Sequence, residues 1–466
     1  MTKGPIANIM AQSLYHAWEF LLLELNSALP GNEIVARYMQ QVALQCLEAN
    51  REGQGPENIF VRIIESRSNF ALMLIQGLIG VKIAPQDVNQ LIGALYSAIA
   101  SIEEPFEKES APLYRTLLKA LYIVLKSHAG QTSAAGSGSG GESISGDTLV
   151  SRIQMVLDIL DRVVGKGFRT LVTLIHDKNT AVSPEDLGLI TAVLQACLAL
   201  PDMNQQQTQV LNIMAAHDAM HVACSLFSWS DKITDNGDPV YGELSLLFLL
   251  ELSKLPMVAE QLACNGVISQ LTSANLTRFM RRGVISPFAD NVGAQRCYSV
   301  WAKAMLPLLL NLLTAMGTTV APEVSYVLNQ FPSLLKSSVE RFEAPGTSRT
   351  ASKEAKHYVT LLTAMEIHSL AILTRVLGAL RQNNNRDIPE VRWDGASLLE
   401  YVEFWLSSRR LLRERLLPLG QREVEWKSMK SAAAAANGAT DGWESVLEEK
   451  VVVQLEAVRD VLVEEA

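Results

Sequence analysis

The chain is poor in cysteine and has no excess of positive charge, and both deficits narrow the class of protein. The 466 residues include no CxxC pair, and the five cysteines lie far apart in apolar helical contexts: Cys46, Cys197, Cys224, Cys264 and Cys297. Such cysteines are typical of free buried thiols, which predicts a reducing compartment, cytosol or nucleus. The net charge of −9 argues against nucleic-acid binding and against a polybasic membrane surface, because both depend on Lys and Arg.

Long apolar runs are also missing. The most hydrophobic stretch, residues 244–252, is interrupted by Ser245 and Glu251. No run reaches about 18 residues, the length of a membrane-spanning helix. The N-terminal segment is broken by polar residues and does not fit a signal peptide. We therefore expect an intracellular protein that does not insert into a membrane.

Catalytic motifs are lacking as well. The sequence has no P-loop, no GxSxG and no GxGxxG after a strand. The HDAMH run places His217 and His221 at i and i+4, a spacing that on one helix could hold a metal. The Glu of a zinc protease is replaced by Asp218, however, and no third ligand is evident. We expect no enzyme activity, no cofactor and no metal site, with a metalloenzyme using this pair as a remote alternative.

Two clusters of charge are better explained as solvated surface than as sites. One is an acidic run beside Pro105, which predicts an exposed loop: Glu103, Glu104, Glu107 and Glu109. The other is a set of arginines interspersed with Glu400, Glu403 and Glu414: Arg409, Arg410, Arg413 and Arg415. We expect salt bridges along a helix face here rather than a phosphate site. His368, in an apolar helical run, is expected to be a paired core or groove histidine.

The residues that are abundant favour helices. Hydrophobic residues make up 48% of the chain and aromatics only 6%, so the apolar content is mainly aliphatic, which suits helix-on-helix packing. Apolar residues advance by threes and fours over 150–164 and again over 443–462. Residues 183–186 (SPED) place a hydroxyl at a cap, Pro at the first helical position and acids in the first turn. Asp441 and Glu444 predict a similar start for the last helix.

One stretch has the pattern of a helical repeat. SLLFLLELSKLPMVAEQLACNGVISQLTS predicts a helix, a tight turn, a short helix ending at Gly266, and a new helix that opens with Val267 and Ile268. This resembles armadillo and HEAT-type repeats, although the match is good only once and the period elsewhere is irregular. The predicted fold is therefore all-α, an irregular armadillo/HEAT-like α-solenoid built as a superhelical stack of helix pairs.

Composition divides the chain into three parts. Residues 1–129 are expected to form N-terminal helical repeats, and residues 147–466 C-terminal repeats that end in a capping helix. Residues 130–146 (GQTSAAGSGSGGESISG) have the composition of a flexible linker or loop, either native or an engineered splice. Residues 341–352 and 431–442 are two further candidate loops.

Tryptophans concentrate in the last 75 residues: Trp393, Trp405, Trp426 and Trp443. Tyr401 and Phe404 lie beside Trp405 on the same expected helix. Two interpretations are open, a core that closes the end of the stack and a partner-binding surface, because aromatic residues anchor interfaces. The candidate partner-binding residues are Trp393, Tyr401, Phe404 and Trp405.

Long stretches of the C-terminal half resemble a known family. RCYSVWAKAMLPLLLNLL, VLNQFPSLLKSSVERFEAP, YVTLLTAMEIHSLAILTRVLGALR and EVRWDGASLLEYVEFWLSSRRLLRERLLPLGQREVEW are similar to the C-terminal region of the nucleoporin 188 family. The similarity is strongest over about residues 150–430. Its sister family, nucleoporin 192/205, stays open as an alternative. These are helix-packing sequences, and no motif transfers a binding residue of the family to a position in this chain.

The resemblance implies a non-enzymatic scaffold of the inner ring of the nuclear pore complex, at the nuclear envelope. It implies a superhelical α-solenoid that binds helical or linear segments of other nucleoporins, notably the 93/96-kDa inner-ring adaptor, and supports nucleocytoplasmic transport. Phenylalanine-glycine repeats and transport receptors are further partners that it implies. A karyopherin-like transport receptor is the alternative function.

Overall fold

The computed structural model describes residues 5–29, 31–52, 58–81, 83–135, 146–233, 237–282, 285–344, 358–383, 387–431 and 444–463. These residues are helical nearly throughout and contain no β-strand. Two isolated bridges, Val359 with Leu416 and Lys430 with Ser445, are the β-type pairings in this part of the chain. The prediction of an all-α helical solenoid is confirmed.

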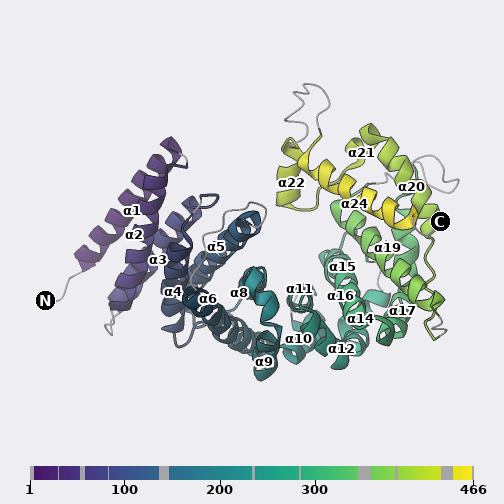
Figure 1. Ribbon diagram of the computed structural model, residues 1–466, viewed down its shortest axis with the longest axis horizontal. Coiled ribbons are helices and arrows are strands. Elements are labelled where there is room, and N and C mark those ends of the chain that lie inside the picture. Colours follow the sequence, from purple (N-terminus) through teal and green to yellow (C-terminus); the bar gives the residue numbers. More distant parts are fainter. Residues whose placement is uncertain are drawn as a thin grey trace. The chain divides into compact units, whose positions relative to one another are not determined.

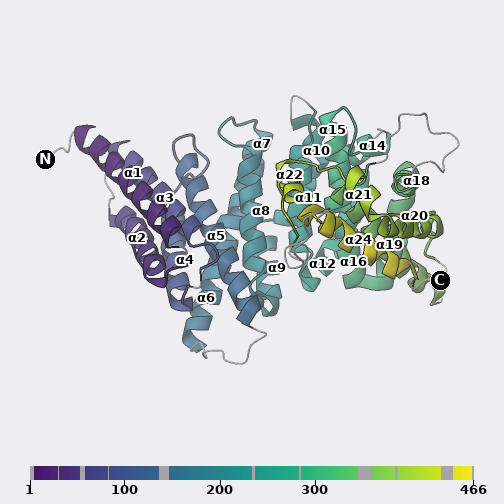
Figure 2. The ribbon, with the colours of Figure 1, turned by 90° about the horizontal axis from the view of Figure 1, so that it is seen from above.

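The chain forms two compact units, Met1–Val222 and Ala223–Ala466, and the boundary falls inside helix α10 (Ala219–Ile233). In the N-terminal unit α3 packs against α1, α2 and α5, and α5 packs against α4 and α8, so each helix meets near neighbours in the sequence (Figures 1 and 2). Its helices are α1 (Pro5–Ala28), α2 (Glu33–Glu52), α3 (Asn58–Gly77), α4 (Pro85–Ala100), α5 (Ala111–Ala135), α6 (Gly146–Ile159), α7 (Gly167–His176), α8 (Pro184–Leu198) and α9 (Gln207–Ala216).

The C-terminal unit also packs helix on helix, but several of its contacts join helices farther apart in the sequence. Helix α12 packs on α16, α16 packs on α19, and α19 packs on α24 (Figure 1). Its helices are α11 (Val240–Leu252), α12 (Pro256–Cys264), α13 (Val267–Ser273), α14 (Asn275–Arg282), α15 (Val292–Ser299), α16 (Leu306–Met316), α17 (Ala321–Asn329), α18 (Pro332–Glu340), α19 (Leu361–Gln382), α20 (Gly395–Ser407), α21 (Arg409–Arg415), α22 (Gln421–Ser428) and α24 (Val446–Val463).

Two long helices contain a π-helical segment. Segment η1 (Leu160–Lys166) joins α6 to α7, and η3 (Val300–Met305) joins α15 to α16. A π turn takes up more residues than an α turn, so it rotates the side chains that follow relative to those before it. Both segments bury most of their residues, so the change of register serves packing on two successive faces of one helix.

The local signals read from the sequence appear where they were expected. Helix α8 begins after Ser183 with Pro184 at its first position, and the Asp186 carboxylate accepts the Ser183 N–H at 2.7 Å. Around residue 266, α12 ends at Cys264, Gly266 adopts φ +70°, and α13 opens with Val267 and Ile268. Glycine tolerates this left-handed backbone, which lets the chain reverse without a loop.

The linker prediction falls largely outside the described residues. Helix α5 continues to Ala135 and α6 begins at Gly146, so both ends of segment 130–146 are helical, and 136–145 are not described. The division at this segment stays a prediction, while the two compact units divide after Val222. The candidate loops after residues 344 and 431 and the expected cap at Asp441 also fall mostly outside the described residues. Helix α24 starts at Val446, where the Ser445 hydroxyl accepts the Glu448 N–H at 3.1 Å.

Two helical stretches in the described part, Val292–Thr319 and Leu361–Gln382, are long and apolar enough to cross a membrane by length and composition. A third would arise if the bent pair α9 and α10 were counted as one span. A count of uninterrupted apolar residues misses these stretches, because scattered polar residues interrupt both of them. About half of each apolar window is buried inside the protein, 56% and 50% respectively, because these faces pack against other helices.

Candidate partner-binding groove

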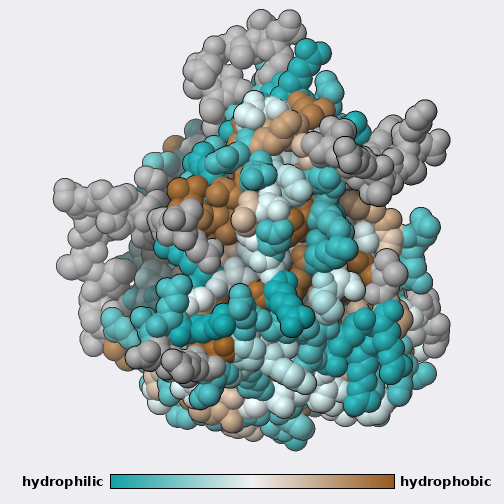
Figure 3. Space-filling view, turned by 90° about the vertical axis from the view of Figure 1, so that its right-hand side faces the viewer, coloured by the Kyte–Doolittle hydropathy of each residue, from teal (hydrophilic) through white to brown (hydrophobic). Residues whose placement is uncertain are grey.

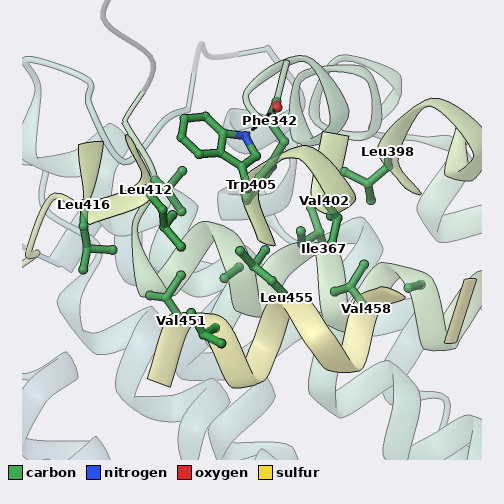
Figure 4. Close-up of a cluster of buried hydrophobic side chains, with 14 of the residues drawn as sticks. Phe342, Ile367, Leu398, Val402, Trp405, Leu412, Leu416, Val451, Leu455 and Val458 are labelled. Atoms are coloured by element: carbon green, nitrogen blue, oxygen red, sulfur yellow. Dashed lines mark hydrogen bonds between the residues drawn. The ribbon is translucent and has the colours of Figure 1, made fainter. Parts of the chain in front are cut away.

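Trp405 lies in the core of the C-terminal unit. Its side chain has no exposed surface, and its Nε1 donates to the Phe342 carbonyl at 2.8 Å (Figure 4). The surrounding cluster comes from α19, α20, α21 and α24, with Ile367, Val402 and Leu455 among its fully buried members. A buried indole usually finds such an acceptor, since an unpaired N–H would be costly. Of the two interpretations of the tryptophans, the structure places Trp405 in the core, and a partner-binding role for this residue stays a prediction.

The neighbouring aromatic side chains pack against this core and are partly buried by it. Phe404 packs edge-on against Trp405, with ring centroids 5.6 Å apart, and is partly buried. Tyr401 is also partly buried against the cluster. Burial and the nearby carboxylates, Glu343 first among them, raise the pKa of Tyr401. A partner-binding role for Tyr401 and Phe404 stays a prediction, and neither residue lines a described groove.

Trp393 is the predicted residue that the structure brings to a groove. It belongs to the segment 387–394, which precedes α20. Asn329 of α17 ties down this segment, because its Nδ2 donates to the Glu390 carbonyl at 2.9 Å and its Oδ1 accepts the Arg392 N–H at 3.3 Å. The indole is oriented by its Nε1, which donates to the Ser338 hydroxyl at 3.0 Å. The orientation of the ring is therefore fixed by a hydrogen bond within the C-terminal unit.

The groove is formed by α19, the 387–394 segment, α20 and the end of α24. It has a volume of about 1090 Å³. Its apolar lining comes from all four elements: Leu377, Val391, Trp393, Leu399 and Leu462. At Gly395 an added Cβ would lie 3.3 Å from Leu462 and 3.6 Å from the Trp393 ring, so the lack of a side chain lets α20 approach α24 closely at this point.

Charged side chains lie along the rim of this groove. Arg381 Nη1 lies 2.9 Å from Glu390 Oε2, and both side chains are substantially exposed, so the pair contributes little to stability. Glu400 adds another carboxylate to the lining. Figure 3 shows one face of the protein, on which small hydrophobic patches lie between hydrophilic residues. An apolar floor with a charged rim is the usual anatomy of an interface that takes up a helix or linear segment.

The arginine cluster is salt-bridged, but its partners differ from the expected ones. Arg413 Nε lies 2.8 Å from Glu448 Oε2, and Arg409 Nη2 lies 3.2 Å from Glu456 Oε1. Both acids belong to α24, far away in the sequence. Of the expected acids, Glu414 pairs with Arg410 at 3.5 Å. Arg409 and Arg413 therefore join α21 to α24, while Arg410 and Glu414 form the expected pair along one helix face.

The histidine pair does not form the face that its spacing suggested. Helix α9 ends at Ala216, and Asp218 adopts φ +54°, so His217 and His221 lie on opposite sides of a helix break. His217 Nε2 is 2.7 Å from Asp161 Oδ1, while His221 is exposed. Over the described ranges, no group of three His, Cys, Asp or Glu side chains could hold a metal ion.

Two other polar predictions are confirmed. His368 Nδ1 lies 2.8 Å from Gln454 Oε1, so it is a paired histidine between α19 and α24. The acidic run Glu103–Glu109 lies in an exposed loop between α4 and α5. Four residues that line the groove were not predicted from the sequence, namely Leu377, Arg381, Leu399 and Leu462. No local signal marks them, since each belongs to an ordinary amphipathic helix.

Successive packing of short helices on one another defines an α-helical repeat protein of the solenoid type. The chain belongs to the family described as Nuclear pore protein NUP188 C-terminal domain, whose family model matches residues 91–462. It is 50% identical to nucleoporin NUP188 of Chaetomium thermophilum over 97% of this chain and 26% of that protein. It is also 21% identical to nucleoporin NUP188 of Saccharomyces cerevisiae over 63% of this chain and 18% of that protein.

A solved structure agrees with this assignment. A fragment of Nup188 from Myceliophthora thermophila superposes with a TM-score of 0.70 at 52% identity, covering 82% of this chain and all of that fragment. The resemblance to nucleoporin 188 is thereby confirmed. Its relatives are nucleoporins, components of the nuclear pore complex at the nuclear envelope, so the predicted localisation is confirmed too. Homology supports a role in the pore scaffold. The chain spans about a quarter of the length of the Chaetomium relative.

Proposed function

We propose that this chain binds an amphipathic helical segment of another nucleoporin, of the inner-ring adaptor type, in the groove around Trp393. The observation that carries the proposal is a pre-oriented tryptophan at the edge of an apolar groove whose rim is charged. An amphipathic helix presents apolar anchors at i, i+3 and i+4 and polar residues around them, which matches this arrangement. Support for nucleocytoplasmic transport would follow from holding such adaptors in the pore.

The dimensions and chemistry of the groove support this choice. A volume of about 1090 Å³ accommodates several side chains of one helix face, rather than a single one. Arg381 and Glu390 form an exposed pair that can exchange partners at small cost, so they can meet acidic and basic residues of an incoming helix. Binding would bury Trp393 further, and aromatic residues of this kind dominate interface energies.

Isothermal titration of the chain with a helical peptide from the 93/96-kDa adaptor tests the proposal. We expect saturable binding that Trp393→Ala weakens by about 2 kcal/mol or more, as for a central aromatic anchor. Leu399→Ser should weaken binding as well, because it removes part of the apolar wall.

Trp229→Ala is the matched control, since Trp229 is 46% exposed and does not line the groove. Binding that both tryptophan variants reduce equally, or that neither reduces, would place the adaptor elsewhere. A lack of binding at high micromolar peptide would remove this chain from the adaptor contact altogether.

A further inference from the structure

In the N-terminal unit, the loop 101–110 separates two grooves. The first groove, of about 480 Å³, lies between the loop, the ends of α2 and α4, the middle of α3 and the start of α5. The second, of about 560 Å³, lies between the loop, α4 and the η1–α7 helix. Glu103, Glu104 and Glu107 line both grooves, so the loop forms a shared acidic wall.

The first groove combines this acidic wall with an apolar one. Ile64, Ile102 and Leu113 are partly exposed in it, and Leu117 lies buried at its base. The polar groups among its remaining residues are hydroxyls and one amide, that of Asn50, whose Nδ2 donates to the Ser68 hydroxyl at 3.1 Å and whose Oδ1 has no hydrogen-bond partner. No Lys or Arg lines this groove. Its polar chemistry is therefore dominated by acceptors.

The carboxylates of the wall lack a direct salt-bridge partner among the described residues. In the described part of the chain, none of Glu103, Glu104 and Glu107 forms an ion pair. Glu107 instead makes a hydrogen bond with Glu104, and this bond, together with the negative charge of Glu104, raises the pKa of Glu107. Two carboxyl groups this close repel each other when both are ionised, so a cation placed beside them would be stabilised.

The second groove provides an internal contrast. Arg162 and Lys166 of η1 form its far wall, opposite the same three carboxylates. A basic ligand would meet repulsion there and none in the first groove. The loop's own basic residue, Lys108, lines neither groove.

We propose that the first groove binds a linear segment of a partner protein in which Lys or Arg stands next to an apolar side chain. The apolar side chain lies against Ile64 and Leu113, and the cation lies between Glu104 and Glu107. Charge complementarity selects this occupant, since a basic, partly apolar peptide suits both walls, while the carboxylates repel an acidic one.

Fluorescence anisotropy of the full chain tests this site with a synthetic peptide that carries two Arg-Leu pairs in a Gly and Ser background. We expect saturable binding that weakens as salt rises, because the contacts are exposed charges. The variant Glu104→Gln/Glu107→Gln should bind about tenfold more weakly, since it removes both carboxylates from the wall. Leu113→Ser should weaken binding about fivefold by removing apolar contact.

Matched variants separate the groove from general charge attraction. Glu24→Gln/Glu33→Gln changes the net charge equally, but neither residue lines either of these grooves, so affinity should change less than twofold. Arg162→Gln in the second groove should not weaken binding. If Leu113→Ser fails to fold by circular dichroism, Ile64→Ala replaces it. The proposal is wrong if the Arg-Leu peptide does not bind saturably, if a Glu-Leu peptide binds as well, or if the control variant loses as much affinity.

Discussion

Glu366 Oε2 of α19 lies 2.7 Å from Nη1 of Arg341, just after α18, and the Glu366 side chain has no exposed surface. The same carboxylate accepts the Tyr298 hydroxyl at 2.5 Å and the Trp301 Nε1 at 2.9 Å. Arg341 also stacks over the Tyr298 ring at 4.8 Å. One buried acid thus joins α15, η3, the end of α18 and α19. Burial first, and then the charge of Glu366, raises the pKa of Tyr298 well above its ordinary value.

Glu366→Leu should lower the free energy of unfolding by about 3–5 kcal/mol, because it leaves the Arg341 charge and two donors without their acceptor. The double variant Glu366→Leu/Arg341→Met should recover a large part of this loss, since no buried charge is then unpaired. Urea unfolding followed by circular dichroism measures both. Glu340→Gln is the control, as its 3.5 Å pair with Lys336 is exposed. A double variant as unstable as the single one would contradict this account.

Trp405→Ala should destabilise the chain by about 3–5 kcal/mol, because it empties a fully buried site. Trp405→Phe keeps most of the apolar volume but loses the donor to the Phe342 carbonyl, and we expect a smaller loss of about 1–3 kcal/mol. Thermal unfolding of both variants checks the order. Trp229→Ala, at an exposed position, should cost at most about 1 kcal/mol. If Trp405→Ala leaves stability intact, the core placement is refuted.

The N-terminal unit should lose stability in mild acid through His128, which is 3% exposed. Burial, and then the positive charge of Arg152, lowers its pKa, whereas the charge of Asp202 acts in the opposite direction. A histidine whose pKa is lower in the folded chain than in the unfolded chain stabilises the fold fully at pH values above the unfolded-chain pKa of about 6.5. This stabilisation is lost as the pH falls from there through the pKa of the folded chain. Melting temperatures from neutral pH downward should therefore drop more for the parent chain than for His128→Gln. Parallel curves would exclude His128 as the cause.

Thiol reactivity should single out one cysteine. Cys264 is exposed, whereas the other four are buried. Burial raises the pKa of Cys197, Cys224 and Cys297 to about 12, so only about one thiol in ten thousand is ionised at pH 8. Brief labelling with N-ethylmaleimide and mass spectrometry should modify Cys264 first, and Cys264→Ser should remove the fast phase. Rapid labelling of Cys197 in the folded chain would contradict the burial.

Two glycines should respond to alanine with opposite signs. At Gly242 in α11 an added Cβ would lie 2.5 Å from the Ser230 hydroxyl and 2.8 Å from Leu276, so Gly242→Ala should cost about 1–3 kcal/mol. At Gly130 in α5 nothing lies within 4 Å, and alanine should stabilise the helix by up to about 1 kcal/mol. Chemical denaturation of the two variants measures the difference. Equal effects would show that helices α10, α11 and α14 do not approach as closely as described.

The sequence by itself determined the helices and several of their ends, because these depend on residues three or four positions apart. The SPED cap, the turn at Gly266 and the all-α class were all predicted in this way, and so was the family, from long runs of helix-packing sequence.

Tertiary structure decided what no local spacing encodes. Trp405 and Trp393 look alike in sequence, yet one lies in the core and the other lines a groove. The break at Asp218 separates two histidines whose spacing suggested one face. Arg413 forms an ion pair with Glu448 of the last helix rather than with an acid nearby in the sequence, and Glu366 accepts a hydrogen bond from Tyr298 of another helix. Helix formation is local, but burial and pairing depend on which distant helices pack together, and only the folded chain fixes that.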